Sequence, residues 1–197
     1  MKQIPESDGL APAGNSNALK MTDVRYRNSI ESGKCGVRLA AKGDARLLWA
    51  WANDPSTRQQ SFRQEFISWS DHEAWFSRIL SANRARLWIL ELEKVPVGQI
   101  RYEQRTSETA EISFSVAEPF RGRGIGSQLL LLTLAPAARE LNVGQMRGIT
   151  FVNNIPSQRA FLSAGFEVRE RAVIQGNPCL VFERSCEADV LRTEDIC

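Results

Sequence analysis

A glycine-rich segment near the middle of the chain has the residue types needed to bind phosphate. Residues 121–127 read RGRGIGS, and they follow an alternating, strand-like run and open a leucine-rich helix. The first turn of a helix leaves backbone N–H groups unpaired and carries a partial positive charge, and glycines let phosphate oxygens approach the backbone. Arg121 and Arg123 can add charge-assisted hydrogen bonds. The segment therefore predicts a site for a nucleotide-containing cofactor.

The two commonest phosphate-binding motifs do not fit this segment. It lacks the Lys-Ser/Thr pair of a nucleotide-triphosphate P-loop. A dinucleotide-binding βαβ unit would begin with a parallel strand, whereas this loop lies in the middle of the chain and follows strands that we expect to be antiparallel. Both alternatives are therefore disfavoured.

Length, charge and cysteine content limit the class of protein. The 197 residues are 43% hydrophobic and 24% charged, which is enough for one substantial core plus tails. A net charge of +2 is too small to indicate nucleic acid or an anionic membrane as a partner. The four cysteines lack metal-ligand spacing, and the chain begins without the apolar core of a signal peptide. We expect a soluble cytoplasmic protein with reduced thiols and no bound metal.

Hydrophobic periodicity predicts an α/β domain. We expect a flexible extension at residues 1–34, one folded domain at 35–185 and a loose tail at 186–197. A capping box at residues 70–73 is expected to start a helix, Pro136 to kink or shorten another, and Gly165 to close a third. The predicted strands cover residues 37–40, 86–93, 97–104, 110–116, 145–152, 166–174 and 178–183, and the predicted helices cover residues 44–53, 70–80, 125–141 and 157–164, with a loop at 54–67.

Two separate signatures carry a family resemblance. The first is EISFSV at residues 111–116 followed by the glycine loop, and the second is Asn154-x-x-Ser157-x-x-x-Phe161-x-x-x-Gly165-Phe166. Together they resemble the GNAT superfamily of acetyl-CoA-dependent N-acetyltransferases. The resemblance implies a mixed, mostly antiparallel sheet that splays open after the fourth strand and is flanked by about four helices. It also implies acetyl-CoA as the co-substrate of an enzyme that acetylates amines.

The same resemblance implies a set of cofactor-binding residues. The pantetheine arm would pair like an extra strand with β-structure around Val116, and the backbone amides of residues 122–127 would hold the pyrophosphate. Asn154 would contact the arm, and a backbone N–H near Val116 would stabilise the oxyanion. The full predicted set is Val116, Arg121, Gly122, Arg123, Gly124, Ile125, Gly126, Ser127, Asn154, Ser157 and Phe161.

Two residues are candidates for the base that deprotonates the attacking amine. Glu111 shares a strand face with Ser113 and Ser115, and the family often has a functional acid at this position; the alternative is an ordinary solvated glutamate. His72 is the only histidine and has a suitable unperturbed pKa, but its position in a helical first turn is equally compatible with capping or packing. The sequence leaves both alternatives open.

The family's usual general acid is missing. Phe161 occupies the position where many relatives carry a tyrosine, so another group must protonate the departing thiolate or the thiolate must leave unprotonated. Tyr26 and Tyr102 are the tyrosines available as substitutes. A thiol with a pKa of about 8.5 is a fair leaving group at neutral pH, so water is a third possibility.

The N-terminal half of the predicted domain carries the candidate acceptor site. Trp51, Asn53, Arg58 and Phe62 lie in a segment that is similar to acetyltransferases of nucleotide-linked amino sugars in bacterial surface-glycan pathways. Aromatic rings can stack on a base or sugar, and an arginine can bind a diphosphate. The alternatives are acetylation of a protein N-terminus or a lysine, and an acyl-CoA-binding module without turnover. We expect a monomer or homodimer that takes a small-molecule amine, with a nucleotide sugar as the favoured acceptor.

Overall fold

The computed structural model describes residues 35–186 of the chain. The predicted extension at 1–34, with Tyr26, and the predicted tail from residue 187, with Cys197, lie outside the described residues. Cys186 was assigned to the tail, and this assignment is wrong. Its side chain is buried in the main core, and its backbone N–H donates to the carbonyl oxygen of Gly144 at 2.7 Å.

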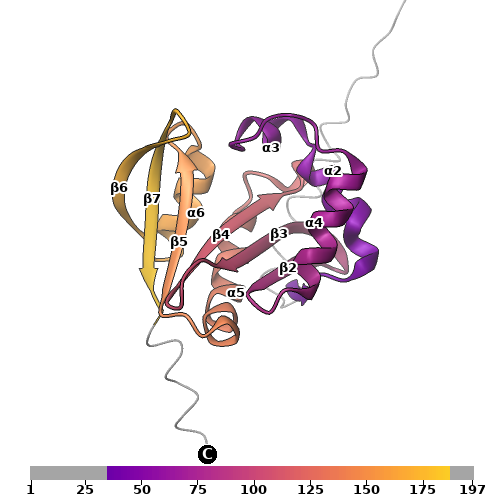
Figure 1. The fold of residues 1–197 in the computed structure, drawn as a ribbon, viewed down its shortest axis with the longest axis horizontal. Coiled ribbons are helices and arrows are strands. Elements are labelled where there is room, and N and C mark those ends of the chain that lie inside the picture. The colour runs from indigo at the N-terminus through magenta and orange to yellow at the C-terminus, as the bar shows by residue number, and fades with distance from the viewer. Residues whose placement is uncertain (1–34, 187–197) are drawn as a thin grey trace, which may run out of the picture.

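Seven strands form one sheet in the order β1-β2-β3-β4-β5-β7-β6 (Figure 1). Strands β4 and β5 run parallel, and every other neighbouring pair in the described residues is antiparallel. The predicted meander of three adjacent antiparallel strands, β2-β3-β4, is therefore confirmed. The strands are β1 (Cys35–Leu39), β2 (Ala85–Leu92), β3 (Val95–Gln104), β4 (Thr109–Val116), β5 (Gln145–Phe151), β6 (Glu167–Ile174) and β7 (Asn177–Ser185).

The sheet splits between β4 and β5, as the family resemblance implied. Residues 109–112 of β4 pair with residues 145–148 of β5, and the pairing stops there although both strands continue. Figure 1 shows the two strands diverging toward the end of β4. The backbone at the end of β4 therefore has no neighbouring strand on its β5 side.

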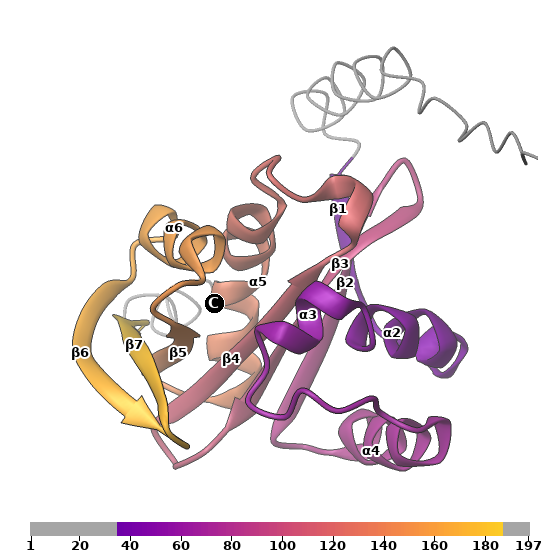
Figure 2. The same cartoon turned by 90° about the horizontal axis from the view of Figure 1, so that it is seen from above.

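Five α-helices in the described residues cover the two faces of the sheet. Figure 2 shows α5 and α6 on one side and α2, α3 and α4 on the other. The strand β2 is buried on both faces: Trp88 and Leu90 belong to the core under α5, and Leu87 and Ile89 belong to the core under α2 and α4. The helices are α2 (Ala45–Ala52), α3 (Pro55–Gln59), α4 (Trp69–Ser81), α5 (Ile125–Leu141) and α6 (Ile155–Ser163), with 3₁₀ turns η1 (Lys42–Asp44) and η2 (Glu118–Phe120).

Helix α3 corrects the predicted loop at 54–67. Asp54 caps it by accepting a hydrogen bond from the backbone N–H of Thr57 at 3.0 Å, and Pro55 occupies the first turn, where its missing N–H costs nothing. The same Asn-Asp-Pro sequence that ends α2 therefore starts another helix. Sequence reasoning identified the stop and overlooked that Asp-Pro is also a start signal.

The cap of α4 differs from the prediction, whereas α5 has its predicted bounds, 125–141. Ser68, two residues before the predicted cap, accepts the N–H of Asp71 at 3.1 Å, so a shorter acidic residue takes the place of the glutamate in the expected motif. Pro136 does not end α5, which continues to Leu141 and stops at Asn142 in a left-handed conformation. Gly165 closes α6 with a φ of +79°, as predicted.

Phe161 holds α6 against the sheet through a position that only glycine can occupy. Its ring stacks on Phe182 at 5.2 Å and meets Phe114 and Phe166 edge-on. The ring lies over Gly148 on β5, where an added Cβ would overlap the aromatic atoms. Gly148 is thus the position that lets α6 and β5 approach each other, and it is the last residue of β5 that pairs with β4 before the split.

Replacing Gly148 with alanine is expected to destabilise the fold by about 1–3 kcal/mol, because the buried ring must leave its position. Urea unfolding measures the change. The matched control is Gly36→Ala on β1, where an added Cβ meets nothing within 4 Å, and which should stay within about 0.5 kcal/mol of wild type. Equal effects of the two substitutions would contradict this account.

Candidate active site

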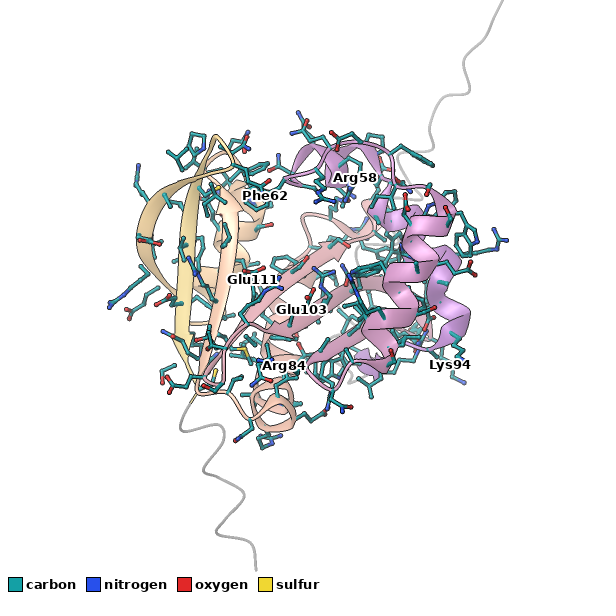
Figure 3. All side chains as sticks on the ribbon, in the orientation of Figure 1. Arg58, Phe62, Arg84, Lys94, Glu103 and Glu111 are labelled. Atoms are coloured by element: carbon teal, nitrogen blue, oxygen red, sulfur yellow. The ribbon has the colours of Figure 1, made fainter. Side chains whose placement is uncertain are left out.

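A cleft of about 980 Å³ opens where β4 and β5 separate. Much of its wall comes from the end of β4, the glycine loop with the start of α5, the start of α6, and residues 56–62 from α3 onward, and β3, β5, α2 and α4 add further residues. Figure 3 shows Arg58 and Phe62 at the open end, with Glu111 deeper, on β4. Of the predicted site residues, the cleft is lined by Phe62, Arg58, His72, Glu111, Val116, Arg121, Gly122, Gly124, Ile125, Gly126, Ser127, Asn154, Ser157 and Phe161.

The glycine loop has the backbone shape expected of an anion cradle. Gly122 and Gly124 have φ values of +73° and +80°, and a Cβ built on either would point into open space. Gly124 is the N-cap of α5, so the first N–H groups of that helix, from Ile125 onward, have no partner within the helix. The loop therefore presents exposed donors at the positive end of a helix, which suits a diphosphate.

Gly126 is needed for packing. An added Cβ would lie 2.9 Å from the Phe114 ring and 3.2 Å from the Cβ of Ala160. The glycine therefore brings α5 close to β4 and α6, and its N–H is positioned as a consequence. Arg123, alone among residues 121–127, is not part of the cleft lining.

Arg121 contacts protein groups on three sides. Its Nε donates to the Val116 carbonyl oxygen at 2.9 Å, and its Nη2 forms an ion pair with Asp54 at 2.7 Å. The remaining nitrogen donates to the hydroxyl of Ser56. The guanidinium thus joins the glycine loop to the end of β4 and to the N-terminus of α3, a set of contacts that the predicted phosphate role did not anticipate.

The end of β4 exposes main-chain polar groups to the cleft. The N–H of Ala117 donates to the Val97 carbonyl oxygen at 2.9 Å on the β3 side. Because backbone groups of successive strand residues point to opposite edges, those of Val116 and Phe114 point to the β5 side, where no strand pairs with them. The N–H groups of Phe114 and Val116 and the carbonyl oxygen of Phe114 are available to hydrogen-bond a ligand that lies between the two strands, whereas the Val116 carbonyl oxygen already accepts from Arg121.

Asn154 and Ser157 lie at the start of α6. The Asn154 side-chain oxygen accepts the backbone N–H of Ser157 at 3.2 Å, so Asn154 is the N-cap of the helix. Both residues line the cleft. The capping bond uses the oxygen of the Asn154 amide and orients its NH₂ group by fixing the side chain.

Glu111 lies at the deep end of the cleft among charges of both signs. In the sheet register, Glu111 lies opposite Glu103 of β3 and opposite Arg147 of β5. It is therefore next to the last pair of residues that joins β4 to β5. Its carboxylate forms an ion pair with Arg105 at 2.9 Å. Figure 3 shows Glu111 and Glu103 on adjacent strands.

His72 is buried at the base of the acceptor side. It is 2% exposed, and its ring stacks on Phe76 with a centroid distance of 5.9 Å. Its Nε2 donates to the Ala45 carbonyl oxygen at 2.9 Å, which links α4 to α2. Burial lowers the pKa of His72, with partial opposition from that hydrogen bond, so the ring is neutral at neutral pH.

Two of the four predicted acceptor residues lie outside the cleft. Trp51 packs against the core between α2, α4 and the sheet. Asn53 fixes the segment before α4: its side chain donates to the Ile67 carbonyl oxygen at 3.0 Å and accepts the Ile67 N–H at 2.8 Å. We therefore correct the prediction for both residues, which shape the acceptor side from behind its surface.

Arg58 and Phe62 do line the cleft. Phe62 meets Phe151 of β5 edge-on at 5.1 Å, so the segment after α3 reaches across the split. Arg58 donates to the Ser61 hydroxyl and the Arg63 carbonyl oxygen, and burial lowers the pKa of its guanidinium. Among the described residues, no carboxylate forms an ion pair with Arg58.

Tyr102, one of the candidate general acids, is excluded by its position. It is fully buried against α5, and its hydroxyl hydrogen-bonds to Thr133 at 2.9 Å. Burial raises the pKa of this hydroxyl. Phe161 is also 2% exposed, so the position of the usual tyrosine belongs to the core here.

Sequence reasoning missed the part of the cleft that β3 supplies. Gln99 and Arg101 of β3 line it on the same face as Ser113 and Ser115 of β4. Arg101 lies over the ring of Trp75 of α4 at 5.2 Å. The alternation of polar Gln99 and Arg101 with buried Ile100 and Tyr102 was the available signal.

The split sheet, the left-handed glycine loop and the exposed edge of β4 are typical of a protein that binds a phosphate-containing cofactor. A family comparison agrees: the family described as "Acetyltransferase (GNAT) domain" matches residues 36–167. The chain belongs to this family, and it is a GNAT-type N-acetyltransferase that uses acetyl-CoA. A search of curated protein sequences found no match.

Solved structures share the fold at low sequence identity. A spermidine N-acetyltransferase from Vibrio cholerae, in complex with CoA and spermine, has a TM-score of 0.72 and 17% identity over 81% of this chain and 99% of its own. An aminoglycoside acetyltransferase with coenzyme A has a TM-score of 0.67 and 16% identity over 82% and 99%. A ribosomal L7/L12 alpha-N-protein acetyltransferase with coenzyme A has 0.67 and 16% over 77% and 94%.

The helices and the metal-ligating side chains of the described residues bear on membranes and metals. None of the helices in residues 35–186 has the length and apolarity needed to cross a bilayer. The same part of the chain contains no group of three or more His, Cys, Asp or Glu side chains arranged to hold a metal ion.

The lowered pKa of His72 predicts that stability decreases below neutral pH. In the unfolded chain, a histidine with a pKa of 6.5 binds a proton as the pH falls, whereas folded His72 stays neutral over part of that range. The free energy of unfolding should therefore fall between about pH 7.5 and about pH 5.5. His72→Gln keeps a donor for the Ala45 carbonyl oxygen and removes the titrating group. The free energy of unfolding of this variant, measured in urea, should therefore depend less on pH between these values. An unchanged pH dependence would contradict the assignment.

Proposed function

We propose that this enzyme transfers the acetyl group of acetyl-CoA directly to a primary amine of a nucleotide-linked amino sugar. The observation that carries the transfer reaction is the opening between β4 and β5 beside the unpaired amides of the first turn of α5. The acceptor class rests on the charges and unpaired polar atoms of the cleft. The cytoplasmic location expected from the sequence stays a prediction.

The cradle of the glycine loop fits the diphosphate of coenzyme A. The amides of residues 122–127 bind phosphate oxygens, and the space beside Gly122 and Gly124 is open where a side chain would fill it. The main-chain groups of Phe114 and Val116 hydrogen-bond the amide-rich pantetheine arm along the free edge of β4. The amide of Asn154, fixed by its capping bond, contacts the same arm from α6.

Glu111 removes a proton from the attacking amine, directly or through one water molecule. The amine nitrogen then forms a bond to the carbonyl carbon of the thioester, and the C–S bond breaks. The N–H of Val116 stabilises the oxyanion that forms in between. The sulfur leaves as a thiolate, because a thiol of pKa about 8.5 is a fair leaving group. The nitrogen, positively charged after the attack, gives its surplus proton to water, and the thiolate takes up a proton through the same water.

The charge of the cleft favours an acceptor that carries an anion. The arginines in its lining are Arg58, Arg101, Arg121 and Arg159, against two carboxylates. Both carboxylates already have partners: Glu111 pairs with Arg105, and Asp71 accepts the Ser68 hydroxyl. A polycation would meet few free negative charges here, whereas a diphosphate would find Arg58, which has no ion pair among the described residues; Arg101 is already paired with Glu103 at 2.7 Å.

Unpaired polar atoms in the same cleft support a polar acceptor. The Nε of Arg58, the Oε1 of Gln60 and the Oγ1 of Thr150 are buried and have no hydrogen-bond partner among the described residues. All three residues line the cleft. Burying unpaired polar groups is costly, so a ligand that supplies an anion, a donor and an acceptor would compensate.

Thiol release from acetyl-CoA in the presence of different amines tests the proposal. The panel contains a UDP-linked amino sugar, the free amino sugar, spermine, an aminoglycoside and a peptide with a free N-terminus. We expect the highest kcat/KM with the UDP-linked amino sugar. Preference for the peptide would favour protein acetylation, and acetyl-CoA binding without any accepted amine would indicate a binding module.

Gly124→Val is expected to weaken acetyl-CoA binding by about tenfold or more, equivalent to about 1.4 kcal/mol, because the side chain fills the cradle and disfavours the φ of +80°. Isothermal titration calorimetry measures the affinity. Gly176→Val is the matched control, since Gly176 has a φ of +78° and open space around it but lies in the β6–β7 turn. Equal affinities in the two variants would show that the loop does not bind the cofactor.

Glu111→Gln is expected to lower kcat by about 100-fold at neutral pH, because an amide cannot accept the proton of the amine. The loss should shrink as the pH rises and more amine is deprotonated in solution. Glu103→Gln, on the adjacent strand and also paired with Arg105, removes a charge of the same kind next to the site. A loss of the same size in that control would assign the effect to the ion-pair cluster.

A further inference from the structure

We propose that Arg121 and Asp54 are a positioning pair that holds the acceptor side of the cleft in register with the cofactor loop. Arg121 then acts through Asp54 on the placement of the acceptor, and the backbone of the loop alone binds the phosphates. The inference rests on the proposed acetyl transfer and adds a role for two residues that do not touch the reacting atoms.

The contacts of Arg121 join elements that are far apart in the sequence. Its hydrogen bonds go to Val116 at the end of β4, and to Asp54, Ser56 and Thr57 at the start of α3. These four bonds use four of the five N–H groups of a guanidinium. A side chain held in this way has little capacity left for a phosphate.

Asp54 is fixed from the other side by its own helix. One carboxylate oxygen accepts the N–H of Thr57 at 3.0 Å, the hydroxyl of Ser56 at 2.8 Å and the Nη2 of Arg121 at 2.7 Å. Although burial opposes it, these bonds lower the pKa of Asp54 to about 2, so the residue is charged at neutral pH. The same carboxylate therefore starts α3 and attaches it to the glycine loop.

Helix α3 carries the acceptor side of the cleft. Arg58 lies on it, and Gln60 and Phe62 follow directly. Phe62 reaches Phe151 on β5, so the segment is attached to both sides of the split: by Arg121 near β4 and by an aromatic contact at β5. Release of the ion pair frees one of the two attachments.

The consequence for catalysis is selective. Attack requires the amine nitrogen close to the thioester carbon, and a displacement of about 1 Å can cost about 100-fold in rate. Loss of the pair should therefore reduce kcat/KM for the amine and leave acetyl-CoA affinity nearly unchanged. If Arg121 were a phosphate ligand, its loss would weaken acetyl-CoA binding. Loss of Asp54 would then leave acetyl-CoA binding unchanged.

The test uses the full chain and the variants Arg121→Gln, Asp54→Asn and their combination. Asparagine is as good an N-cap as aspartate, so Asp54→Asn removes the charge and keeps the cap. Kinetics with acetyl-CoA and the best amine of the panel, together with calorimetric titration of acetyl-CoA, give the two readouts. We expect each single variant to lose about tenfold in kcat/KM for the amine, the double variant to lose no more, and the acetyl-CoA Kd to change by less than about twofold.

Asp44→Asn is the matched control, because Asp44 likewise accepts a backbone N–H, from Ala41, and pairs with Arg38 at 2.7 Å, but lies outside the cleft lining. It should lower stability and keep kcat/KM for the amine. An equal loss of kcat/KM for the amine in this control would show that the Arg121–Asp54 pair only stabilises the fold, and it would overturn the proposal.

Two further outcomes separate the proposal from the function on which it rests. A tenfold weaker acetyl-CoA Kd in Arg121→Gln with normal Asp54→Asn would make Arg121 a phosphate ligand and refute the positioning role, while acetyl transfer stands. Absence of amine-dependent thiol release in the wild-type protein would refute both.

Discussion

The structure depends on the early end of the pairing between β4 and β5. Four residues of each strand pair in parallel, and then the strands separate while β4 continues to Val116. Backbone N–H and C=O groups must find partners, and those of Phe114 and Val116 face the gap. The unused edge of a strand thus becomes a binding surface for a ligand with its own amide groups. Everything else in the site is arranged around this gap.

Aromatic packing and an ion pair set the two walls of the gap. On one wall, Phe161 packs on Gly148 and joins α6 to β5. On the other, Arg121 joins α3 to the end of β4. The glycine loop lies between them, and its backbone shape follows from left-handed residues at Gly122 and Gly124. Packing therefore forms both walls of the cleft, and the backbone N–H donors of the first turn of α5 lie between the walls.

Local patterns predicted much of this arrangement, and contacts between distant residues were beyond them. The alternation at residues 111–116 and the glycine loop were sufficient for the strand, the turn and the family, and Gly165 marked the end of α6. Trp51 and Asn53 were misassigned because an aromatic residue and an amide look alike in sequence whether they face a ligand or a core. The partners of Arg121 at the start of α3 lie 64–67 residues away, so no spacing rule could pair them. The cap of α4 was missed because Ser68 uses aspartate where the motif expects glutamate.

Hydrogen exchange of backbone amides, with and without acetyl-CoA, tests the central claim most directly. The free edge of β4 and the first turn of α5 carry donors that only the cofactor satisfies, so binding should slow exchange at Phe114, Val116 and residues 124–127. The β6–β7 hairpin, on the far side of the sheet, should exchange at the same rate in both states. Saturating acetyl-CoA with no added protection along β4 and the start of α5 would contradict the account.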